Sequence, residues 1–253
     1  PKILCNNNNN RKKGFKVKEK LVVIGNGMSG LRTIEDLLEI NKDKYEIIIY
    51  GEEPHVNYNR IMLSYILSQE KTFEDTIINH QSWYEQNSIT LHKGDKVISI
   101  DKHNKTIKSE SGKIESYDKL LIATGSTAFV PKTTGSELEN VIAFRTKADV
   151  DAIISTIRKD KTAVVVGGGL LGLEAAYGIA MHGIKTILVH RSGSILSQQL
   201  DSTGGKLLRK NLEKYGIEFK LNTTIKEILG DGIVEKVEFT DGICIESNLV
   251  VFA

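Results

Sequence analysis

The stretch VVIGNGMSG, from Val22 to Gly30, decides how the first half of this chain folds. An apolar run rich in β-branched residues predicts a buried strand, and glycines follow it with the spacing Gly-x-Gly-x-x-Gly. The same arrangement returns in VVVGGGLLG, from Val164 to Gly172. Each copy stands between a strand signal and a helix signal, which is the context that distinguishes a dinucleotide-binding turn from an incidental run of glycines.

In such a turn each glycine has a separate mechanical role. The first makes the tight bend after the strand, the second lets a pyrophosphate approach the backbone, and the third lets the helix pack closely against the strand. The unpaired N–H groups of the helix N-terminus then attract the phosphates. We therefore predict cofactor contacts at Gly25, Asn26, Gly27, Met28, Ser29 and Gly30 in the first turn, and at Gly167, Gly169, Leu170, Leu171 and Gly172 in the second.

Strands and helices alternate around both turns, and a helix-free stretch of short strands lies between them at residues 96–117. A strand–helix–strand order implies parallel pairing with helices covering the sheet. The predicted fold class is α/β: two Rossmann-like, three-layer dinucleotide-binding domains with β-meander crossovers. We expect an N-terminal tail at 1–18, where Asn6–Asn10 is a homopolymeric run, a first domain at 19–145 and a second at 146–253.

The net charge, the lengths of the apolar runs and the positions of the cysteines argue against several classes of function. The chain has 253 residues and a formal net charge of +2, too small to indicate a nucleic-acid or membrane partner. No apolar run reaches membrane-spanning length and no signal peptide is evident, so we expect a cytoplasmic protein. Cys5 and Cys244 lie far apart, so no metal site is predicted.

The residues after the second strand of each half indicate what a bound ribose would meet. Glu52, 22 positions after Gly30, has the spacing of an acid that accepts ribose hydroxyl hydrogen bonds. The second half has His190 and Arg191 there, and no acid. A guanidinium can bind a 2′-phosphate that a carboxylate would repel. Arg191 is therefore compatible with NADPH as the bound nucleotide as well as with NADH.

Taken together, the two turns and the meander resemble the two-domain flavoprotein oxidoreductases. The resemblance implies FAD in the first domain and NAD(P)H in the second. GEEPHVNYNRIMLS (51–64), YDKLLIATGS (117–126) and GGGLLGLEAA (167–176) are similar to segments of that family. It further implies that Glu174 points toward the nicotinamide amide as the catalytic residue, and that FAD contacts arise from Glu52, Glu53, Arg60, Val97, Ala123, Thr124 and Gly125.

Within that superfamily, residues 20–253 resemble the N-terminal part of the assimilatory nitrite reductase large subunit, with rubredoxin and ferredoxin reductases sharing most motifs. The family likeness implies that a C-terminal part of the FAD domain is absent from this chain. Tyr65 stands where many ferredoxin-reductase relatives carry a lysine, and the paired cysteines of the disulfide reductases are missing. A disulfide reductase is therefore disfavoured.

The expected function is an FAD-dependent NAD(P)H oxidoreductase. It would pass hydride from NAD(P)H to flavin and electrons to a downstream iron centre, either sirohaem and iron–sulfur or rubredoxin, with nitrite reduction as the expected process. A rubredoxin or ferredoxin reductase and a truncated, non-catalytic nucleotide-binding module remain as alternatives. Four further residues are expected to be structural or surface residues rather than catalytic ones: Ser64, His80, His182 and His190. The sequence leaves the electron acceptor, the choice between NADH and NADPH and the oligomeric state open.

Overall fold

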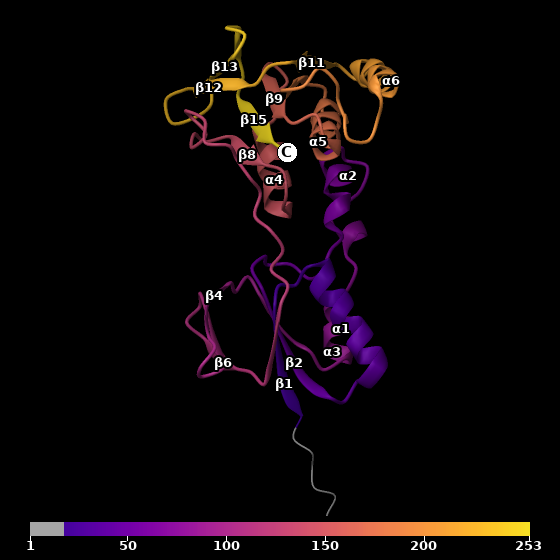
Figure 1. The fold of residues 1–253 in the computed structure, drawn as a ribbon, viewed down its shortest axis with the longest axis vertical. Helices are drawn as coiled ribbons and strands as arrows, with labels where there is room; N and C mark the ends of the chain where they lie inside the picture. Colours follow the sequence, from indigo (N-terminus) through magenta and orange to yellow (C-terminus); the bar gives the residue numbers. More distant parts are fainter. Residues whose placement is uncertain (1–17) are drawn as a thin grey trace, which may run out of the picture. The chain divides into compact units, whose positions relative to one another are not determined.

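The computed structural model describes residues 18–253, so the expected tail, with Asn6–Asn10 and Cys5, lies almost entirely outside the described residues. The described chain divides into two compact units (Figure 1). The first unit ends at Val56 and resumes over His80–Thr124, and the second comprises Asn57–Asn79 and Gly125–Ala253. Each unit contains one of the two glycine turns.

The first unit is built on a four-stranded parallel sheet with the order β3-β2-β1-β7. Helices and a three-stranded antiparallel sheet, β4-β5-β6, complete it. In chain order its elements are β1 (Glu19–Ile24), α1 (Met28–Asn41), β2 (Tyr45–Gly51), α3 (Gln81–Gln86), β3 (Thr90–Lys93), β4 (Val97–Asp101), β5 (Thr106–Ser109), β6 (Ile114–Ser116) and β7 (Lys119–Ile122).

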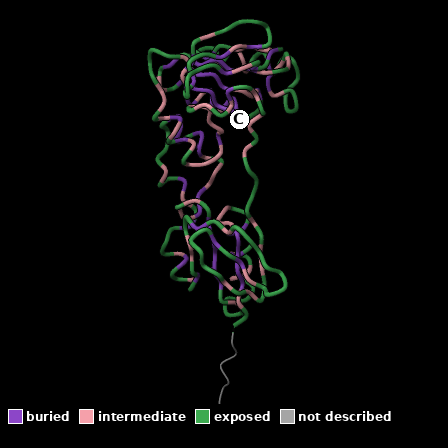
Figure 2. Tube along the Cα trace, turned by 90° about the vertical axis from the view of Figure 1, so that its left-hand side faces the viewer, coloured by how far each residue is buried: buried purple, intermediate pink, exposed green. Residues whose placement is uncertain are grey.

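Alternate residues of β1 supply two separate cores, because successive side chains of a strand point to opposite faces of the sheet. Val23 packs with Leu31 and Ile34 of α1 on one face. Val22 packs with Ile107 of the small antiparallel sheet on the other. Most residues of β1 and β2 are buried, and Figure 2 shows buried segments of the trace inside this unit with exposed segments around them. The unit therefore has the three layers that the sequence predicts.

The second unit repeats this plan with one more strand, in the order β11-β10-β9-β15-β8. Every strand pair in that sheet is parallel, and β12-β13-β14 forms the small antiparallel sheet. In chain order its elements are η1 (Arg60–Met62), α2 (Leu63–Leu67), η2 (Glu74–Thr76), β8 (Val141–Ala143), α4 (Lys147–Thr156), β9 (Thr162–Val166), α5 (Leu170–Ala180), β10 (Lys185–His190), α6 (Ser202–Glu213), β11 (Ile217–Leu221), β12 (Ile225–Leu229), β13 (Lys236–Phe239), β14 (Cys244–Glu246) and β15 (Leu249–Phe252).

The central strand β9 divides its side chains between two faces in the same way as β1. Val165 packs with Leu173 of α5, and Val164 packs with Val237 of β13. The two-fold use of one structural plan, with an α/β fold and parallel sheets, confirms the predicted fold class.

Residues 57–79 are the main departure from the expected organisation. We placed them in a first domain that ended at residue 145, whereas their contacts lie with the second unit. Leu67 of α2 fills the space beside Gly178 of α5, where an added Cβ atom would lie 2.8 Å from the leucine Cγ. The ring Nε2 of His182 lies 2.7 Å from the carbonyl oxygen of Leu67 and is within hydrogen-bonding distance.

The first unit ends at Thr124 rather than at residue 145. The strand β8, which the sequence analysis did not predict, pairs with β15 and so extends the second sheet. Its three residues are only half-buried, and such a short, weakly patterned segment gives little sequence signal.

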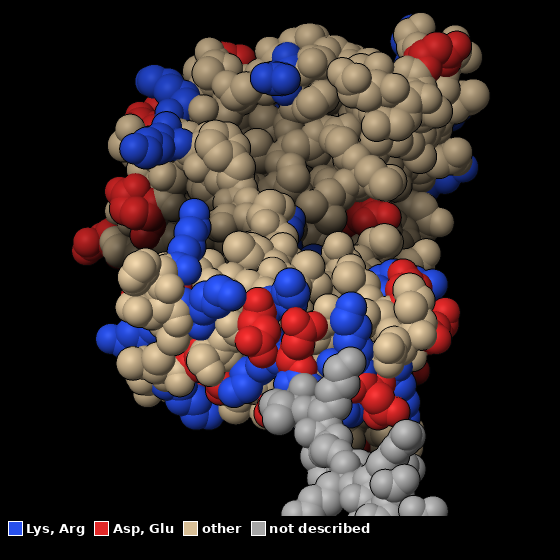
Figure 3. Space-filling view, turned by 60° about the horizontal axis from the view of Figure 1, so that its bottom comes forward, with Lys and Arg blue, Asp and Glu red and all other residues tan. Residues whose placement is uncertain are grey.

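The surface carries both signs of charge. On the face shown in Figure 3, Lys and Arg side chains alternate with Asp and Glu side chains without a large area of one sign. Within residues 18–253, no helix combines the length and the apolar character that a bilayer span requires.

Candidate functional site

In the first turn (Gly25–Gly30), the positions of the first and third glycines have no room for a side chain. Gly25 has φ +111°, and a Cβ atom there would lie 2.2 Å from the carbonyl oxygen of Ala123. A Cβ atom on Gly30 would lie 2.9 Å from the carbonyl oxygen of Gly25. The bend and the close packing of α1 on β1 therefore both depend on missing side chains.

The second turn (Gly167–Gly172) repeats these constraints. Gly167 has φ +134°, and its Cβ atom would lie 2.3 Å from the carbonyl oxygen of Ala253. At Gly172 a Cβ atom would lie 2.1 Å from the carbonyl oxygen of Gly167. In both turns a residue just after a neighbouring parallel strand closes off the first glycine: Ala123 follows β7, and Ala253 follows β15.

The middle glycines behave differently. Gly27 and Gly169 have extended backbone angles, φ −85° and −82°, that any residue can adopt. A Cβ atom at either position would meet nothing within 4 Å. Open space therefore lies above both turns where a pyrophosphate has to approach the backbone, so the residues present fit a dinucleotide.

The helices that follow the turns leave their first N–H groups without a side-chain cap. α1 and α5 start at glycine N-caps that form no side-chain hydrogen bond, and neither helix has an acid in its first turn. Within residues 18–253, the other two helices of ten residues or more are capped, α4 by Thr146 and α6 by Asp201. Uncapped N–H groups with a partial positive charge suit a bound phosphate.

In the first unit, the side chain of Asn26 joins the turn to the loop after β2. Its Nδ2 donates to the carbonyl of His55 at 3.2 Å, and its Oδ1 accepts from the Tyr84 hydroxyl at 2.9 Å. It lies against Gly51, where an added Cβ atom would be 3.0 Å from the asparagine Cβ. The exposed Glu52 follows Gly51 and is paired with Lys96 at 2.7 Å.

In the second unit, the glycine of the corresponding contact belongs to the turn and the side chain belongs to the end of the strand. The His190 ring lies against Gly168, where a Cβ atom would be 2.5 Å from the ring Cγ. The Gly168 N–H donates to His190 Nδ1 at 3.1 Å. Burial of the ring, with a smaller effect from the charge on Arg191, lowers the pKa of His190 below its ordinary value.

The remaining cofactor residues predicted for the first unit lie near its turn or in its small sheet. Met28 and Ser29 are exposed in the first turn of α1, as Leu170 and Leu171 are in α5. Ala123 donates its N–H to the Ile24 carbonyl, which holds the Ala-Thr-Gly segment beside the turn. Val97 begins β4 and packs, half-buried, against the core that contains Val22.

Arg60 and Gly125 belong to the second unit and not to the first. The Arg60 guanidinium donates to the carbonyl of Arg145 at 2.8 Å and lies over the Tyr58 ring, 5.4 Å from its centroid. Gly125 has φ +73°. Their predicted contacts with FAD, and that of Glu53, stay predictions.

Glu174 lies on α5, two residues after Gly172, and is half-buried. Burial raises the pKa of its carboxyl, and a hydrogen bond from the Ser64 side chain partly opposes that rise. Ser64 belongs to α2 and is itself buried. Ser64 was expected to be a structural or surface residue, and the sequence carries no signal of this contact because the two residues are far apart in the chain.

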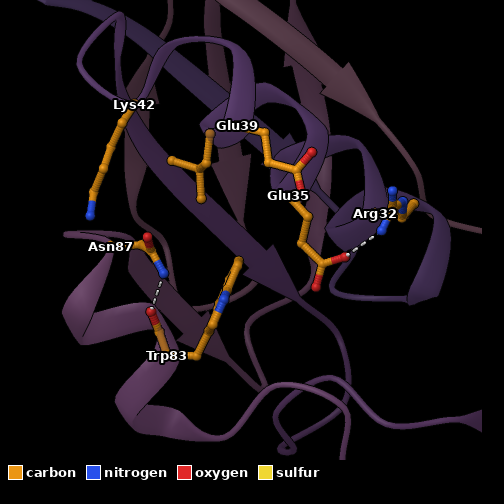
Figure 4. Close-up of a pocket in the computed structure, with 7 residues that line it drawn as sticks. Arg32, Glu35, Glu39, Lys42, Trp83 and Asn87 are labelled. Atoms are coloured by element: carbon orange, nitrogen blue, oxygen red, sulfur yellow. Dashed lines mark hydrogen bonds and ion pairs between the residues drawn. The ribbon is translucent and has the colours of Figure 1, made fainter.

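A surface pocket in the first unit lies away from the turn. Figure 4 shows it between α1 and α3, with Trp83 and the Arg32–Glu35 ion pair among its lining side chains. It contains none of the predicted cofactor residues.

Comparison with known proteins identifies the family to which these paired turns belong. The model of the pyridine nucleotide-disulphide oxidoreductase family matches residues 19–253. The chain belongs to this family. The match covers both glycine turns and confirms the resemblance to flavoprotein oxidoreductases that the motifs indicated.

Among curated relatives, nitrite reductase [NAD(P)H] of Bacillus subtilis (strain 168) is 43% identical over 236 residues, which are 93% of this chain and 29% of that protein. The assimilatory nitrate reductase electron transfer subunit of the same strain is 39% identical over 93% of this chain and 31% of that protein. The chain therefore spans about three tenths of the length of these relatives.

Two solved structures share the fold of this chain. The putidaredoxin reductase of a covalent complex with putidaredoxin matches with a TM-score of 0.84 and 21% identity, over 93% of this chain and 58% of that chain. NADH:rubredoxin oxidoreductase from Clostridium acetobutylicum matches with a TM-score of 0.75 and 28% identity, over the same shares of the two chains.

Proposed function

We propose that this chain acts as an FAD-dependent NAD(P)H oxidoreductase that passes electrons to a metal-centre acceptor, in nitrite reduction. One observation carries the proposal: a single chain contains two glycine turns that each face open space and lead into an uncapped helix. Two such turns suit two different dinucleotides, one retained and one exchanged, because each can hold one pyrophosphate.

Each turn has its own part in this function. The first turn and Glu52 hold the diphosphate and ribose of FAD, and the second turn holds those of NAD(P)H. Glu174 lies one helical turn beyond the second turn's phosphate-binding N–H groups and orients the nicotinamide amide. FAD, when bound, supplies the ring that accepts hydride and releases electrons. The protein contributes position and electrostatics, so no side-chain nucleophile is needed.

Similarity to the nitrite reductase of Bacillus subtilis favours an acceptor that takes part in nitrite reduction. The resemblance described for the sequence implies that this acceptor is a sirohaem and iron–sulfur centre, and we propose a cytoplasmic location. A rubredoxin-type acceptor is the second candidate, because the NADH:rubredoxin oxidoreductase structure is also related in sequence. Adding each acceptor to the reduced protein and following the rate of reoxidation decides between the two.

Gly27→Ala and Gly169→Ala form a matched pair that tests the assignment of the turns. Both positions have backbone angles that alanine adopts and room for a methyl group, so both variants should fold. The added methyl group occupies the path of the pyrophosphate. We expect Gly27→Ala to weaken FAD binding at least about tenfold, a loss of about 1.4 kcal/mol. Gly169→Ala should weaken NAD(P)H binding equally and spare FAD.

The measurements are flavin absorbance after reconstitution and fluorescence titration with NADH and NADPH. Anaerobic NAD(P)H should bleach the flavin of the unmodified protein. A wild-type protein that retains no flavin, or that binds both compounds without bleaching, would contradict the oxidoreductase and support a non-catalytic binding module. An exchange of the two effects would reverse the assignment of the turns.

A further inference from the structure

Residues at the end of β10 would contact the adenosine ribose of a nucleotide that is bound at the second turn. Backbone hydrogen bonds give the correspondence between the two units: Gly25 N–H donates to the Tyr50 carbonyl at 2.8 Å, and Gly167 N–H donates to the Val189 carbonyl at 3.0 Å. Counting on by two residues, Arg191 occupies the position that Glu52 occupies in the first unit. The second unit thus has a cation where the first has an acid.

His190 presents a hydrogen-bond donor beside that cation. Its Nδ1 accepts the Gly168 N–H, so in the neutral imidazole the proton is on Nε2. The lowered pKa of His190 agrees with a neutral ring near pH 7. A carboxylate at the end of this strand would offer acceptors to ribose hydroxyls, whereas this ring offers an N–H, which suits an acceptor such as a phosphate oxygen.

The Arg191 side chain is exposed and, in the part of the chain that the structure describes, forms no hydrogen bond or ion pair. No Asp or Glu occurs from His190 to Leu200, the segment that follows the strand. The guanidinium is therefore not committed to a protein partner and remains available to a ligand anion.

The loop that carries Arg191 is attached to the second turn and to β11. The Leu196 N–H donates to the Gly168 carbonyl at 2.8 Å, and the Asn222 N–H donates to the Ser192 carbonyl at 3.3 Å. Together with the His190 contact, these bonds fix both ends of the segment 190–196. Binding an anion there would require little additional ordering of the backbone.

We propose that His190 and Arg191 bind the 2′-phosphate of NADPH, and that this protein uses NADPH in preference to NADH. This inference rests on the proposed function, because it assigns the ribose end of the nucleotide that the second turn holds. Arg191 supplies a bidentate, charged partner, His190 Nε2–H supplies one further donor, and the Ser192 hydroxyl lies on the same attached loop.

The test is titration of the purified protein with NADPH, NADH, 2′,5′-ADP and 5′-ADP, followed by calorimetry or fluorescence, so that no turnover is needed. We expect NADPH to bind at least tenfold more tightly than NADH, and 2′,5′-ADP more tightly than 5′-ADP. Arg191→Ala should remove that preference by weakening NADPH while changing the affinity for NADH less than twofold. Arg191→Lys should retain part of it.

Arg158→Ala is the matched control. It removes the same charge from the same unit, but Arg158 precedes β9 and so lies at the amino ends of the parallel strands, opposite the turns. Among the residues that the structure describes, its guanidinium donates to the nearby backbone carbonyls of Ser155 and Ile157. The preference for NADPH should be unchanged in this variant.

The outcomes separate the two proposals. Equal or tighter binding of NADH in the wild type, or a preference for NADPH that survives Arg191→Ala, would overturn the 2′-phosphate assignment and leave the oxidoreductase intact. Failure of all four compounds to bind would overturn both.

Discussion

The two glycine turns solve one packing problem with opposite residues. In the first unit the turn supplies the side chain, Asn26, and the strand end supplies the glycine, Gly51. In the second unit the strand end supplies the side chain, His190, and the turn supplies the glycine, Gly168. In each case one side chain links the turn to the loop that follows the second strand, and there is no room for two.

This difference has a chemical consequence. Asn26 is held by the Tyr84 hydroxyl and the His55 carbonyl, and Glu52 beyond it is free of the turn. His190 is held by the turn itself, and Arg191 follows it. The same fold therefore offers an acid at the end of one strand and a cation at the end of the other.

Replacing the first glycine of either turn should have the largest effect. Gly25→Ala and Gly167→Ala put a Cβ atom within 2.3 Å of a carbonyl oxygen at a positive φ. We expect each to reduce the free energy of unfolding by about 3 kcal/mol or more, because backbone strain and overpacking add. Urea denaturation measures the loss. Gly27→Ala is the control, with a change within about 0.5 kcal/mol; similar values for the two substitutions would contradict the geometry.

The contact between Gly168 and His190 can be tested by a double-mutant cycle. Gly168→Ala should cost about 1–3 kcal/mol of stability, because its methyl group would overlap the His190 ring. His190→Gly removes the obstacle and reproduces the arrangement of the first unit. The double variant should be more stable than the sum of the single changes predicts, by about 1 kcal/mol. Strict additivity would show that the two residues do not compete for one space.

The smallest effect should be the pH dependence that His190 contributes to stability. Its pKa in the folded protein lies below the ordinary value of 6.5, so the unfolded chain binds the proton first as the pH falls. The stabilisation is complete above pH 6.5 and is lost as the pH falls from there toward the folded-state pKa. His190→Gln should flatten this part of the stability profile, as measured by denaturation between pH 7 and pH 5.

His92 provides the counterpart of His190 in the first unit, since burial and the nearby Lys113 also lower its pKa. His92→Gln should flatten the profile over the same interval. Each variant should leave the contribution of the other histidine in place. A stability profile that His190→Gln leaves unchanged would contradict the half-buried, neutral ring beside Gly168.

Much of the fold could be predicted from local patterns. The helix signal after the first turn corresponds to α1, the strand signals before both turns correspond to β1 and β9, and the stretch of short strands predicted at 96–117 corresponds to β4, β5 and β6. These elements have strong periodicity and are bounded by glycine or polar turns. The strand β12, the strand β8 and the short helix α2 were missed, because short segments take their structure from the partners they pair with or pack against.

For the candidate site too, local features could be predicted from the sequence and contacts between distant segments could not. The spacing of the glycines was sufficient to identify both turns, and the order of residues after each strand was sufficient to locate Glu52 and Arg191. The partner of Glu174, the attachment of residues 57–79 to α5 and the placement of Arg60 in the second unit were not accessible from the sequence. Each depends on which distant segments pack together.

By itself, the sequence determined that this chain contains two dinucleotide-binding units, since glycine spacing and apolar periodicity act within a few residues and fix the local backbone. Only the tertiary structure decided that Ala123 and Ala253 close off the first glycines, and that Asn26 and His190 occupy matching spaces from opposite sides. Those contacts join residues from different strands, and the register of the parallel sheets brings them together.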